Sequence, residues 1–209
     1  MTAYNKPDHW SIRAQKEGYP ARSVYKLQEI DGKFKLFGRN GARNSAGPLR
    51  ILDLGAAPGS WSLYILKKFG QGVFLAAADL SPLSLKASQL FSGANVFFVQ
   101  GDIYDETVRS ALLEKGPYDA VISDAAPATT GNRSVDTSRS LALAEAALSY
   151  GEAGLRAGGN FVVKVFQGAG TGEFLKRIKE RFTGAKSYKP EACRSNSFET
   201  YYLGLGKKD

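Results

Sequence analysis

The sequence predicts an α/β fold in which helices cover both faces of a mostly parallel sheet. From residue 50 onward, short apolar runs alternate with segments of helical periodicity. The apolar runs are hydrophobic at consecutive positions, which is typical of strands that are buried on both faces. The chain has 209 residues, of which 43% are hydrophobic and 23% are charged. That length and composition fit one globular domain and leave little for a second.

The N-terminal segment, up to about Phe37, predicts two short helices. In the second of them, Val24, Leu27 and Ile30 recur at helical spacing. The following stretch, Gly38–Pro48, is rich in Gly, Asn and Arg and has no periodicity. It therefore predicts a loop.

The elements after this loop alternate in type along the chain. Strands are predicted over residues 50–54, 72–79, 95–100, 118–124 and 159–166. Helices are predicted over residues 61–69, from residue 81 onward, and over 105–114, 137–156 and 171–182. Two more strands, near 184–189 and 198–206, are joined by a short connection, which predicts an antiparallel hairpin at the edge of the sheet.

Acidic residues stand at the ends of the first four predicted strands of the sheet, namely Asp53, Asp79, Asp102 and Asp124. Ligands of such sheets bind outside the carboxyl ends of the strands. An acid after the second strand is placed to bind ribose hydroxyls, and one after the third can accept from an exocyclic amine. This acidic rim suits a nucleoside that carries a positive charge, and S-adenosylmethionine is such a molecule. The alternative is that these acids only cap turns and helices.

A glycine-containing loop, Asp53–Trp61, joins the first of these strands to a helix. Its glycines let the backbone pass close to a ligand and turn sharply into the helix. Ala57 occupies the place of the second glycine of a dinucleotide-binding loop, and Pro58 removes a backbone N–H that a pyrophosphate would use. The loop therefore favours a ligand without phosphates, although on its own it is also compatible with a structural turn or with NAD.

The predicted strand Phe161–Phe166 contains Lys164 between two valines. Lysine is rarely buried in a central strand without a partner or a chemical role. One interpretation is an ion pair with Asp124 or a strand end that reaches solvent, and the other is a general base. Lys26 lies on a predicted amphipathic helix, and taken alone it is interpreted as facing solvent. Glu199 lies on a predicted C-terminal strand, and taken alone it is interpreted as a surface charge on an edge strand.

The scarcity of cysteine and histidine excludes several kinds of site. Cys193 is the only cysteine and His9 the only histidine, which excludes an intramolecular disulfide and the usual zinc motifs and argues against a Ser-His-Asp triad. We expect no metal site. No apolar run reaches the length of a membrane span, and the N-terminus lacks an apolar signal core. We therefore expect no membrane association and a cytoplasmic location.

The net charge of +8 is unevenly distributed along the chain. Residues 1–50 carry +6, residues 51–175 carry −3, and residues 176–209 carry +5. Basic ends around a mildly acidic middle indicate that the two ends face a polyanion. Trp10, Tyr19 and Tyr25 lie among the N-terminal basic residues and could stack on bases, but for Trp10 and Tyr25 we favour packing of the N-terminal helices onto the sheet.

Five separated motifs, which span the chain from about Pro7 to Gly206, resemble the FtsJ/RrmJ family of ribose 2′-O-methyltransferases. They are AQKEGY with RS and YKL within 14–27, DLGAAPGSWS at 53–62, GD at 101–102 with SDAAP at 123–127, FVVKVFQG at 161–168, and KP at 189–190 with the region 195–202. The match is specific because the motifs occur in order at plausible distances. It implies a Rossmann-like class I fold that uses S-adenosylmethionine, with a mostly parallel seven-stranded sheet.

The family's catalytic Lys-Asp-Lys-Glu set falls on Lys26, Asp124, Lys164 and Glu199. The resemblance implies that Lys164 deprotonates the ribose 2′-hydroxyl and that Asp124 orients Lys164. Lys26 would hold the ribose or a nearby phosphate, and Glu199 would fix one lysine or the hydroxyl. The cofactor contacts that it implies are Gly59, Trp61, Asp79, Asp102 and Asp124.

Within the family, the chain resembles the bacterial type that acts on large-subunit rRNA, so the implied partner is the large ribosomal subunit and the implied target a uridine of 23S rRNA. A tRNA methyltransferase of the same family is the alternative, and the absence of the extra C-terminal segment of such relatives counts against it. An NAD-dependent dehydrogenase and a non-catalytic RNA-binding relative are the remaining alternatives. The glycine loop counts against the dehydrogenase, and the intact set of four residues against the non-catalytic relative.

We expect a monomer with a single domain, in which residues 1–49 form a helical, RNA-facing extension and residues 50–209 the catalytic sheet core. Two features depart from the family's pattern. Residues 38–49 are longer and richer in Gly, Asn and Arg than expected, and Ser60 stands where glycine is common. The loop over residues 125–135, which follows Asp124, is expected to order over the RNA.

Overall fold

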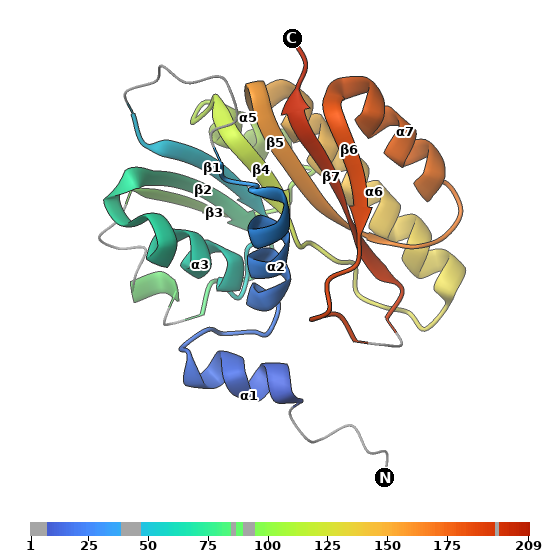
Figure 1. Cartoon of the computed structure of the whole chain (residues 1–209), viewed down its shortest axis with the longest axis horizontal. Helices are drawn as coiled ribbons and strands as arrows, with labels where there is room; N and C mark the ends of the chain where they lie inside the picture. The colour runs from blue at the N-terminus through green and yellow to red at the C-terminus, as the bar shows by residue number, and fades with distance from the viewer. Residues whose placement is uncertain (1–7, 39–46, 85–86, 90–94, 195–196) are drawn as a thin grey trace.

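Seven strands form one sheet in the order β3-β2-β1-β4-β5-β7-β6 (Figure 1). The structure is a computed structural model, and it describes residues 8–38, 47–84, 87–89, 95–194 and 197–209. The strands are β1 (Leu49–Leu54), β2 (Val73–Asp79), β3 (Val96–Gln100), β4 (Tyr118–Ser123), β5 (Leu155–Phe166), β6 (Phe182–Tyr188) and β7 (Glu199–Lys207). The mostly parallel seven-stranded sheet is thereby confirmed.

Strands β1 to β5 pair only in parallel with one another, whereas β7 runs antiparallel to both of its neighbours. The predicted hairpin of β6 and β7 is present, and its second strand is the inner one. The burial of the two strands explains this order, because β7 is buried continuously from Thr200 to Gly204 while most residues of β6 are partly or fully exposed. Strand β6 therefore forms the edge of the sheet.

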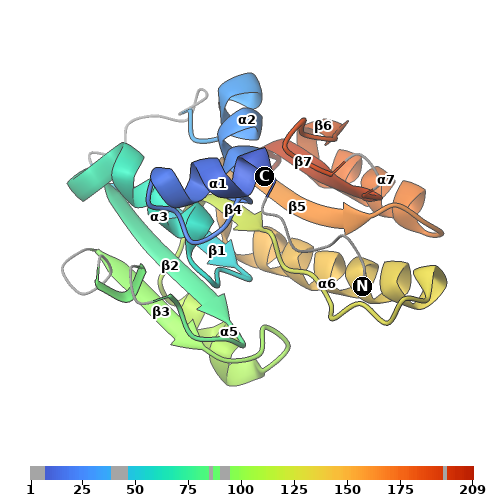
Figure 2. The ribbon, with the colours of Figure 1, turned by 90° about the horizontal axis from the view of Figure 1, so that it is seen from below.

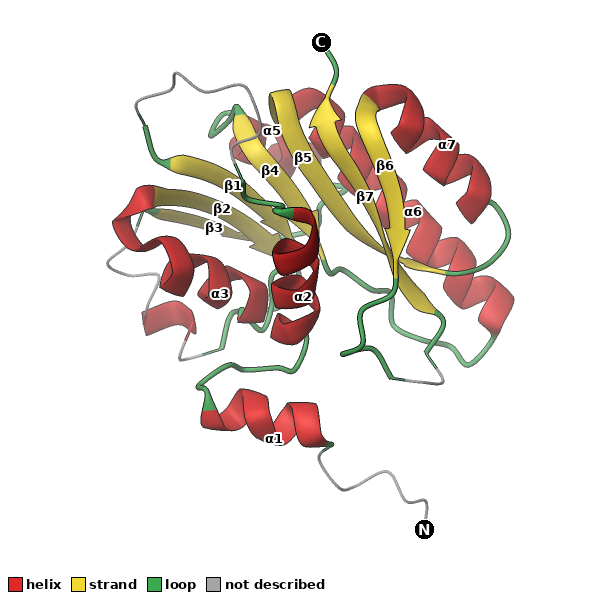
Figure 3. Ribbon diagram, in the orientation of Figure 1, coloured by secondary structure: helices red, strands yellow, loops and turns green. Residues whose placement is uncertain are grey.

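Helices cover both faces of the sheet (Figure 3). Helices α2 (Val24–Phe34) and α3 (Ser60–Phe69) lie on one face, and α5 (Glu106–Leu113), α6 (Arg133–Gly154) and α7 (Thr171–Arg181) lie on the other. A short 3-10 turn, η1 (Gly70–Gly72), follows α3, and α1 (His9–Lys16) lies below the sheet (Figures 1 and 2). Two buried apolar clusters, one on each face, hold these layers together.

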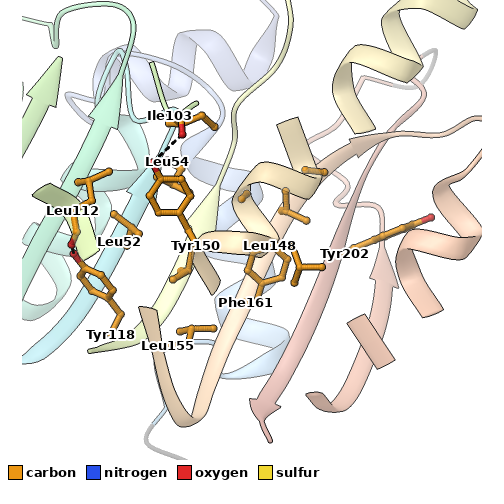
Figure 4. Packing of buried hydrophobic residues seen from close by; sticks show 14 of the residues in the cluster. Leu52, Leu54, Ile103, Leu112, Tyr118, Leu148, Tyr150, Leu155, Phe161 and Tyr202 are labelled. Atoms are coloured by element: carbon orange, nitrogen blue, oxygen red, sulfur yellow. Dashed lines mark hydrogen bonds between the residues drawn. The ribbon is translucent and has the colours of Figure 1, made fainter. Parts of the chain in front are cut away.

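The larger cluster fills the space between the sheet and helices α5, α6 and α7 (Figure 4). Two of its largest side chains, Tyr118 and Tyr150, are almost fully buried and carry a polar hydroxyl. The Tyr150 hydroxyl donates to the carbonyl of Ile103 at 2.9 Å, and the Tyr118 hydroxyl donates to the carbonyl of Leu112. Both hydroxyls are thus satisfied, which removes the cost of burying them.

Three boundaries differ from the sequence prediction by more than two residues. Helix α6 begins at Arg133 and not at 137, because the Asn132 side chain caps the backbone N–H groups of Ser134 and Val135 at 3.0 and 3.3 Å. Strand β5 begins at Leu155 and not at 159, because Leu155 pairs with Tyr118. The helix expected from residue 81 onward is absent at residues 82–84 and present at residues 87–89. Because α6 begins at Arg133, the loop that follows Asp124 ends at Asn132.

The N-terminal helices pack onto the rest of the molecule. Leu27 and Ile30 of α2 belong to the cluster that α3 also joins, and the ring of Trp10 packs against that of Tyr25 at 5.0 Å. Trp10 and Tyr25 therefore pack α1 against α2, and their cluster contains no residue of a strand, so the expected packing of these two side chains onto the sheet is not what the structure shows. Residues 39–46, which make up most of the loop expected over 38–49, lie outside the described residues, as does Lys6.

Candidate functional site

Two buried ion pairs meet at the carboxyl end of β4 and contain all four residues of the expected catalytic set. Lys164 Nζ lies 3.0 Å from Asp124 Oδ1 and donates to the Asp124 carbonyl at 2.5 Å. Lys26 Nζ pairs with Glu199 Oε1. Only 8% of Lys164 and 9% of Lys26 is exposed. The structure therefore brings together four residues that are up to 173 positions apart in the sequence.

Four different elements supply these side chains. Lys26 comes from α2, Asp124 follows β4, Lys164 lies on β5 and Glu199 begins β7. Strands β5 and β7 pair so that Lys164 is opposite Tyr201 and Phe166 is opposite Glu199. Alternate residues of a strand share one face, so Lys164 and Glu199 lie on the same face of the sheet, which α2 covers. This packing explains why Lys26 is buried instead of solvent-facing.

The charges of the cluster stabilise one another. Burial alone would raise the pKa of Asp124, but Lys164, Lys26 and a hydrogen bond from Tyr201 outweigh it, so the pKa lies below its ordinary value. Burial would likewise raise the pKa of Glu199, but the charge of Lys26 outweighs burial and lowers this pKa below its ordinary value. In Lys26, the charges of Asp124 and Glu199 overcome burial and raise the pKa. Both carboxylates and the Lys26 ammonium are therefore held in their charged forms.

Tyr201 is a member of this site that the sequence analysis did not identify. Its hydroxyl is fully buried and donates to Asp124 Oδ1 at 2.6 Å. Burial and the charge of Asp124 raise its pKa well above the ordinary value, so the hydroxyl keeps its proton and acts as a donor. The signal in the sequence was the spacing of two between Glu199 and Tyr201, which places both on one face of a strand.

Cys193 is a second unassigned residue at the site. Its thiol donates to Glu199 Oε1 at 3.1 Å, the same oxygen that pairs with Lys26. Burial and the Glu199 carboxylate raise the pKa of this thiol to about 12. Cys193 is therefore a protonated donor that helps to fix Glu199, and no pattern in the sequence indicated that contact.

A cavity of about 660 Å³ opens beside the cluster, at the carboxyl ends of β1, β2, β3 and β4. It is large enough for a nucleoside-sized ligand. Its lining includes Gly55, Asp79, Leu80, Asp102, Ile103, Tyr104, Ala125 to Ala128 and Arg139. Ala125 directly follows Asp124, so the cavity and the charged cluster share one loop.

Asp79 and Asp102 line this cavity as the sequence predicts. Asp79 accepts backbone hydrogen bonds from Ala57 at 2.9 Å and from Ser81 at 2.7 Å, one on each oxygen. Asp102 accepts from the backbone of Tyr104 at 3.0 Å on Oδ1. A carboxylate has about four acceptor sites, so both residues retain capacity for hydroxyl or amine donors. Both carboxylates can therefore accept hydrogen bonds from a ligand in the cavity.

The glycine loop comes close to its neighbours at two points. Gly55 has φ +76°, and a Cβ there would lie 2.6 Å from the Cα of Ala125. Gly59 has φ +107°, and a Cβ there would lie 2.5 Å from that of Ala87. Only glycine tolerates these conformations and distances. Gly59 lets the loop pack closely against Ala87 and is not among the residues that line the cavity. Gly55 lines the cavity wall directly.

Two residues of the loop region lie elsewhere than at the cavity wall. Trp61 is buried, its indole N–H donates to the Ser23 carbonyl at 2.8 Å, and it borders a small recess that also touches Asp124. Asp53 is fully buried beneath the loop, where its Oδ2 accepts from the Ser62 hydroxyl at 2.6 Å. Its Oδ1 has no hydrogen-bond partner among the described residues. Of the four strand-end acids, Asp53 is therefore the one that is fully buried and bonds to the glycine loop's own helix instead of lining the cavity.

The described part of the chain has neither a metal-binding cluster nor a membrane-spanning helix. No group of three or more His, Cys, Asp or Glu side chains there could hold a metal ion. No helix there is long and apolar enough to cross a membrane.

Comparisons with known proteins found a matching family and similar sequences. The model of the FtsJ-like methyltransferase family matches residues 19–207. The ribosomal RNA large subunit methyltransferase E of Treponema denticola is 49% identical over 205 residues, which cover 98% of this chain and 97% of that protein. The protein of the same name from Oleidesulfovibrio alaskensis is 43% identical over 96% of this chain and 92% of its own length.

Solved structures show the same fold. A candidate ribosomal RNA methyltransferase of Plasmodium falciparum superposes with a TM-score of 0.71 at 26% identity, over 90% of this chain and 98% of its own. Human methyltransferase-like protein 13, solved with SAH, superposes with a TM-score of 0.59 at 17% identity, over 87% of this chain and 81% of its own. The extent of the family match and the identity to the curated relatives leave one conclusion: the chain belongs to the FtsJ-like methyltransferase family.

Proposed function

We propose that this chain transfers a methyl group from S-adenosylmethionine to a ribose 2′-hydroxyl of RNA, and that its substrate is a uridine of 23S rRNA in the large ribosomal subunit. The observation that carries the proposal is the Lys164–Asp124 pair, buried at a strand end next to a nucleoside-sized cavity. The relatives named for large-subunit rRNA support the choice of substrate.

The cavity beside the cluster provides the cofactor site of this proposal. Asp79 is placed to accept from the ribose hydroxyls of the nucleoside and Asp102 from its exocyclic amine. When bound, S-adenosylmethionine supplies a methyl group that its sulfonium activates for attack by oxygen. Gly59 and Trp61 contribute by shaping and bracing the loop, and Asp124 joins the cavity to the cluster.

Lys164 is the proposed base of the reaction. As a neutral amine it takes the proton of the 2′-hydroxyl, and the resulting oxygen is the nucleophile. Asp124 and Tyr201 hold Lys164 in position through the shared Oδ1 atom. Lys26, fixed by Glu199, places a positive charge beside the ribose and its phosphate. The chain thus contributes orientation and proton transfer to the reaction.

The N-terminal extension, residues 1–49, is the proposed RNA-facing part, and residues 50–209 the catalytic core. Several basic residues near the ends of the chain are exposed and make no ion pair with another described residue, among them Lys16, Lys33, Lys35, Lys186, Lys189 and Arg194. They are candidates for phosphate contacts. Arg13 and Arg22 instead pair with Glu17 and Asp8.

One chain contains all four catalytic candidates and the cavity, so the reaction requires no second copy, and we propose a monomer. We also propose that the protein acts in the cytoplasm, because its proposed substrate is rRNA.

The test offers the protein radiolabelled S-adenosylmethionine together with large ribosomal subunits, bare 23S rRNA or tRNA. We expect label at a ribose 2′-oxygen of the rRNA. Label in tRNA alone would overturn the choice of substrate, and RNA binding without any label would overturn the enzymatic function. The Lys164→Ala variant should bind the cofactor but transfer no methyl group, and normal turnover would refute its role as base.

A further inference from the structure

Beyond the catalytic cluster, three side chains form a stack at the rim of the sheet. The ring of Phe166, at the end of β5, packs edge-on against the ring of Phe198 with 4.8 Å between centroids. The guanidinium of Arg133, at the start of α6, lies over the Phe198 ring at 5.4 Å from its centroid. Arg133 is exposed and makes no ion pair with any other described residue.

The register of the sheet places this stack next to the proposed reaction centre. Phe166 is two residues beyond Lys164 on β5, so their side chains share one face. Phe166 is paired with Glu199, and Phe198 directly precedes Glu199. The Phe198 carbonyl accepts the backbone N–H of Gln167 at 2.9 Å, which continues the pairing by one step. Phe166 and Phe198 therefore lie beside Lys164 and Glu199, at the edge of the proposed reaction centre.

The backbone at Arg133 is held in place before any ligand arrives, and the guanidinium lies on the Phe198 ring. Thr130 donates two hydrogen bonds of 2.8 Å to Asp136 Oδ1, one from its backbone N–H and one from its hydroxyl. Together with the Asn132 cap, these contacts fix the start of α6, from which Arg133 projects. A pre-positioned guanidinium loses little freedom on binding.

We propose that the guanidinium of Arg133, supported by Phe198 and Phe166, is a stacking platform for a nucleobase of the RNA substrate, at or next to the methylated nucleotide. An unpaired base stacks readily on an arginine plane. The base of a nucleotide is joined to the carbon next to the one that carries the 2′-hydroxyl, so a ribose at Lys164 brings its base to this rim. Arg133 is then the residue in contact with the base, and Phe198 is a positioning residue. This inference rests on the proposed function.

The test separates the flat shape of the arginine from its charge. Arg133→Lys keeps the charge and removes the plane. Loss of base stacking costs 5- to 150-fold in affinity as an order of magnitude, so we expect the Kd and KM for 23S rRNA to rise by roughly that factor. Because no phosphate contact is lost, the slope of log Kd against log salt concentration should stay unchanged. The Kd for S-adenosylmethionine should not change.

Two further variants complete the experiment. Phe198→Leu should weaken RNA binding in the same way, because the guanidinium loses its aromatic support. Phe198→Tyr keeps an aromatic ring under the guanidinium and should bind RNA as the wild type does. Arg177→Lys, on the exposed side of α7 and paired with Glu145, is the matched control and should behave as the wild type.

Wild-type RNA binding and methyl transfer by Arg133→Lys would overturn the platform. The same conclusion would follow if Arg133→Ala reduced the salt slope by about one and Arg133→Lys restored it, because Arg133 would then be a phosphate contact. If the wild type methylates no RNA at all, the proposed function fails first, which distinguishes that failure from the failure of this inference.

Discussion

The hydroxyl of Tyr201 donates to Asp124 Oδ1 at 2.6 Å, and the same oxygen lies 3.0 Å from Lys164 Nζ. A buried carboxylate oxygen that receives two donors has a fixed direction, and Lys164 is thereby fixed too. The orientation of the proposed base thus depends on Tyr201, which acts on Lys164 through their shared partner Asp124. This relationship leads to the first of four predictions.

Tyr201→Phe removes one hydrogen bond to a charged group and leaves the ring packing against Trp61. Such a bond is worth about 1.5–3 kcal/mol, so we expect kcat for methyl transfer to fall by roughly 10- to 100-fold, with an unchanged Kd for S-adenosylmethionine. Tyr202→Phe is the matched control, because that hydroxyl accepts from Gln167 on the other side of the strand. Equal losses in the two variants would show that the Tyr201–Asp124 bond has no specific role.

The Lys26–Glu199 pair should be strongly coupled in its effect on stability. Lys26→Met leaves Glu199 as a buried charge without its main partner, which we expect to lower the free energy of unfolding by about 3 kcal/mol. The double variant Lys26→Met/Glu199→Gln should lose less, because no unpaired charge remains. Urea unfolding measures both changes.

The exposed Lys176–Glu173 pair is the control for that experiment. Its side chains are 67% and 75% exposed, so breaking it should change stability by less than about 0.5 kcal/mol. Additive losses from the two single substitutions at Lys26 and Glu199 would contradict the coupling.

Asp53 makes the stability of the fold sensitive to pH. Burial raises its pKa to about 7 in the folded protein, from an ordinary value of 3.8. Ionised Asp53 therefore costs stability, and this cost is absent below pH 3.8, grows as the pH rises and is complete above pH 7. Asp53→Asn keeps an acceptor for the Ser62 hydroxyl and removes the charge.

Thermal or urea unfolding of the Asp53→Asn variant at pH 5 and pH 8 measures this effect. The stability gained over the wild type should be larger at pH 8 by about 2 kcal/mol. A gain that is independent of pH would show that Asp53 does not ionise in this range.

Cys193 should react slowly with thiol reagents in the folded protein, because its thiol is buried and its pKa is raised to about 12. Glu199→Gln removes the negative charge that helps to hold the proton, so we expect faster reaction with a disulfide reagent at pH 8. Since Cys193 is the only cysteine, the measured rate belongs to it alone. An unchanged rate would refute the contact with Glu199, and the protein unfolded in urea provides the reference for full reactivity.

The sequence by itself determined the order and type of the elements, because consecutive apolar residues and helical periodicity are local properties. It also placed acids at the strand ends, and two of them, Asp79 and Asp102, line the cavity. The sequence did not predict where α6 and β5 begin. The Asn132 cap sets the start of α6, and the pairing of Leu155 with Tyr118 sets the start of β5.

Only the tertiary structure decided which charges are buried. Lys26 and Glu199 each resemble surface residues in their own segments, and they become one buried pair because α2 packs over the β5–β7 register. The same packing brings Tyr201 onto Asp124 and sets Arg133 over Phe198. Contacts between distant segments depend on register and on helix position, which no local pattern contains.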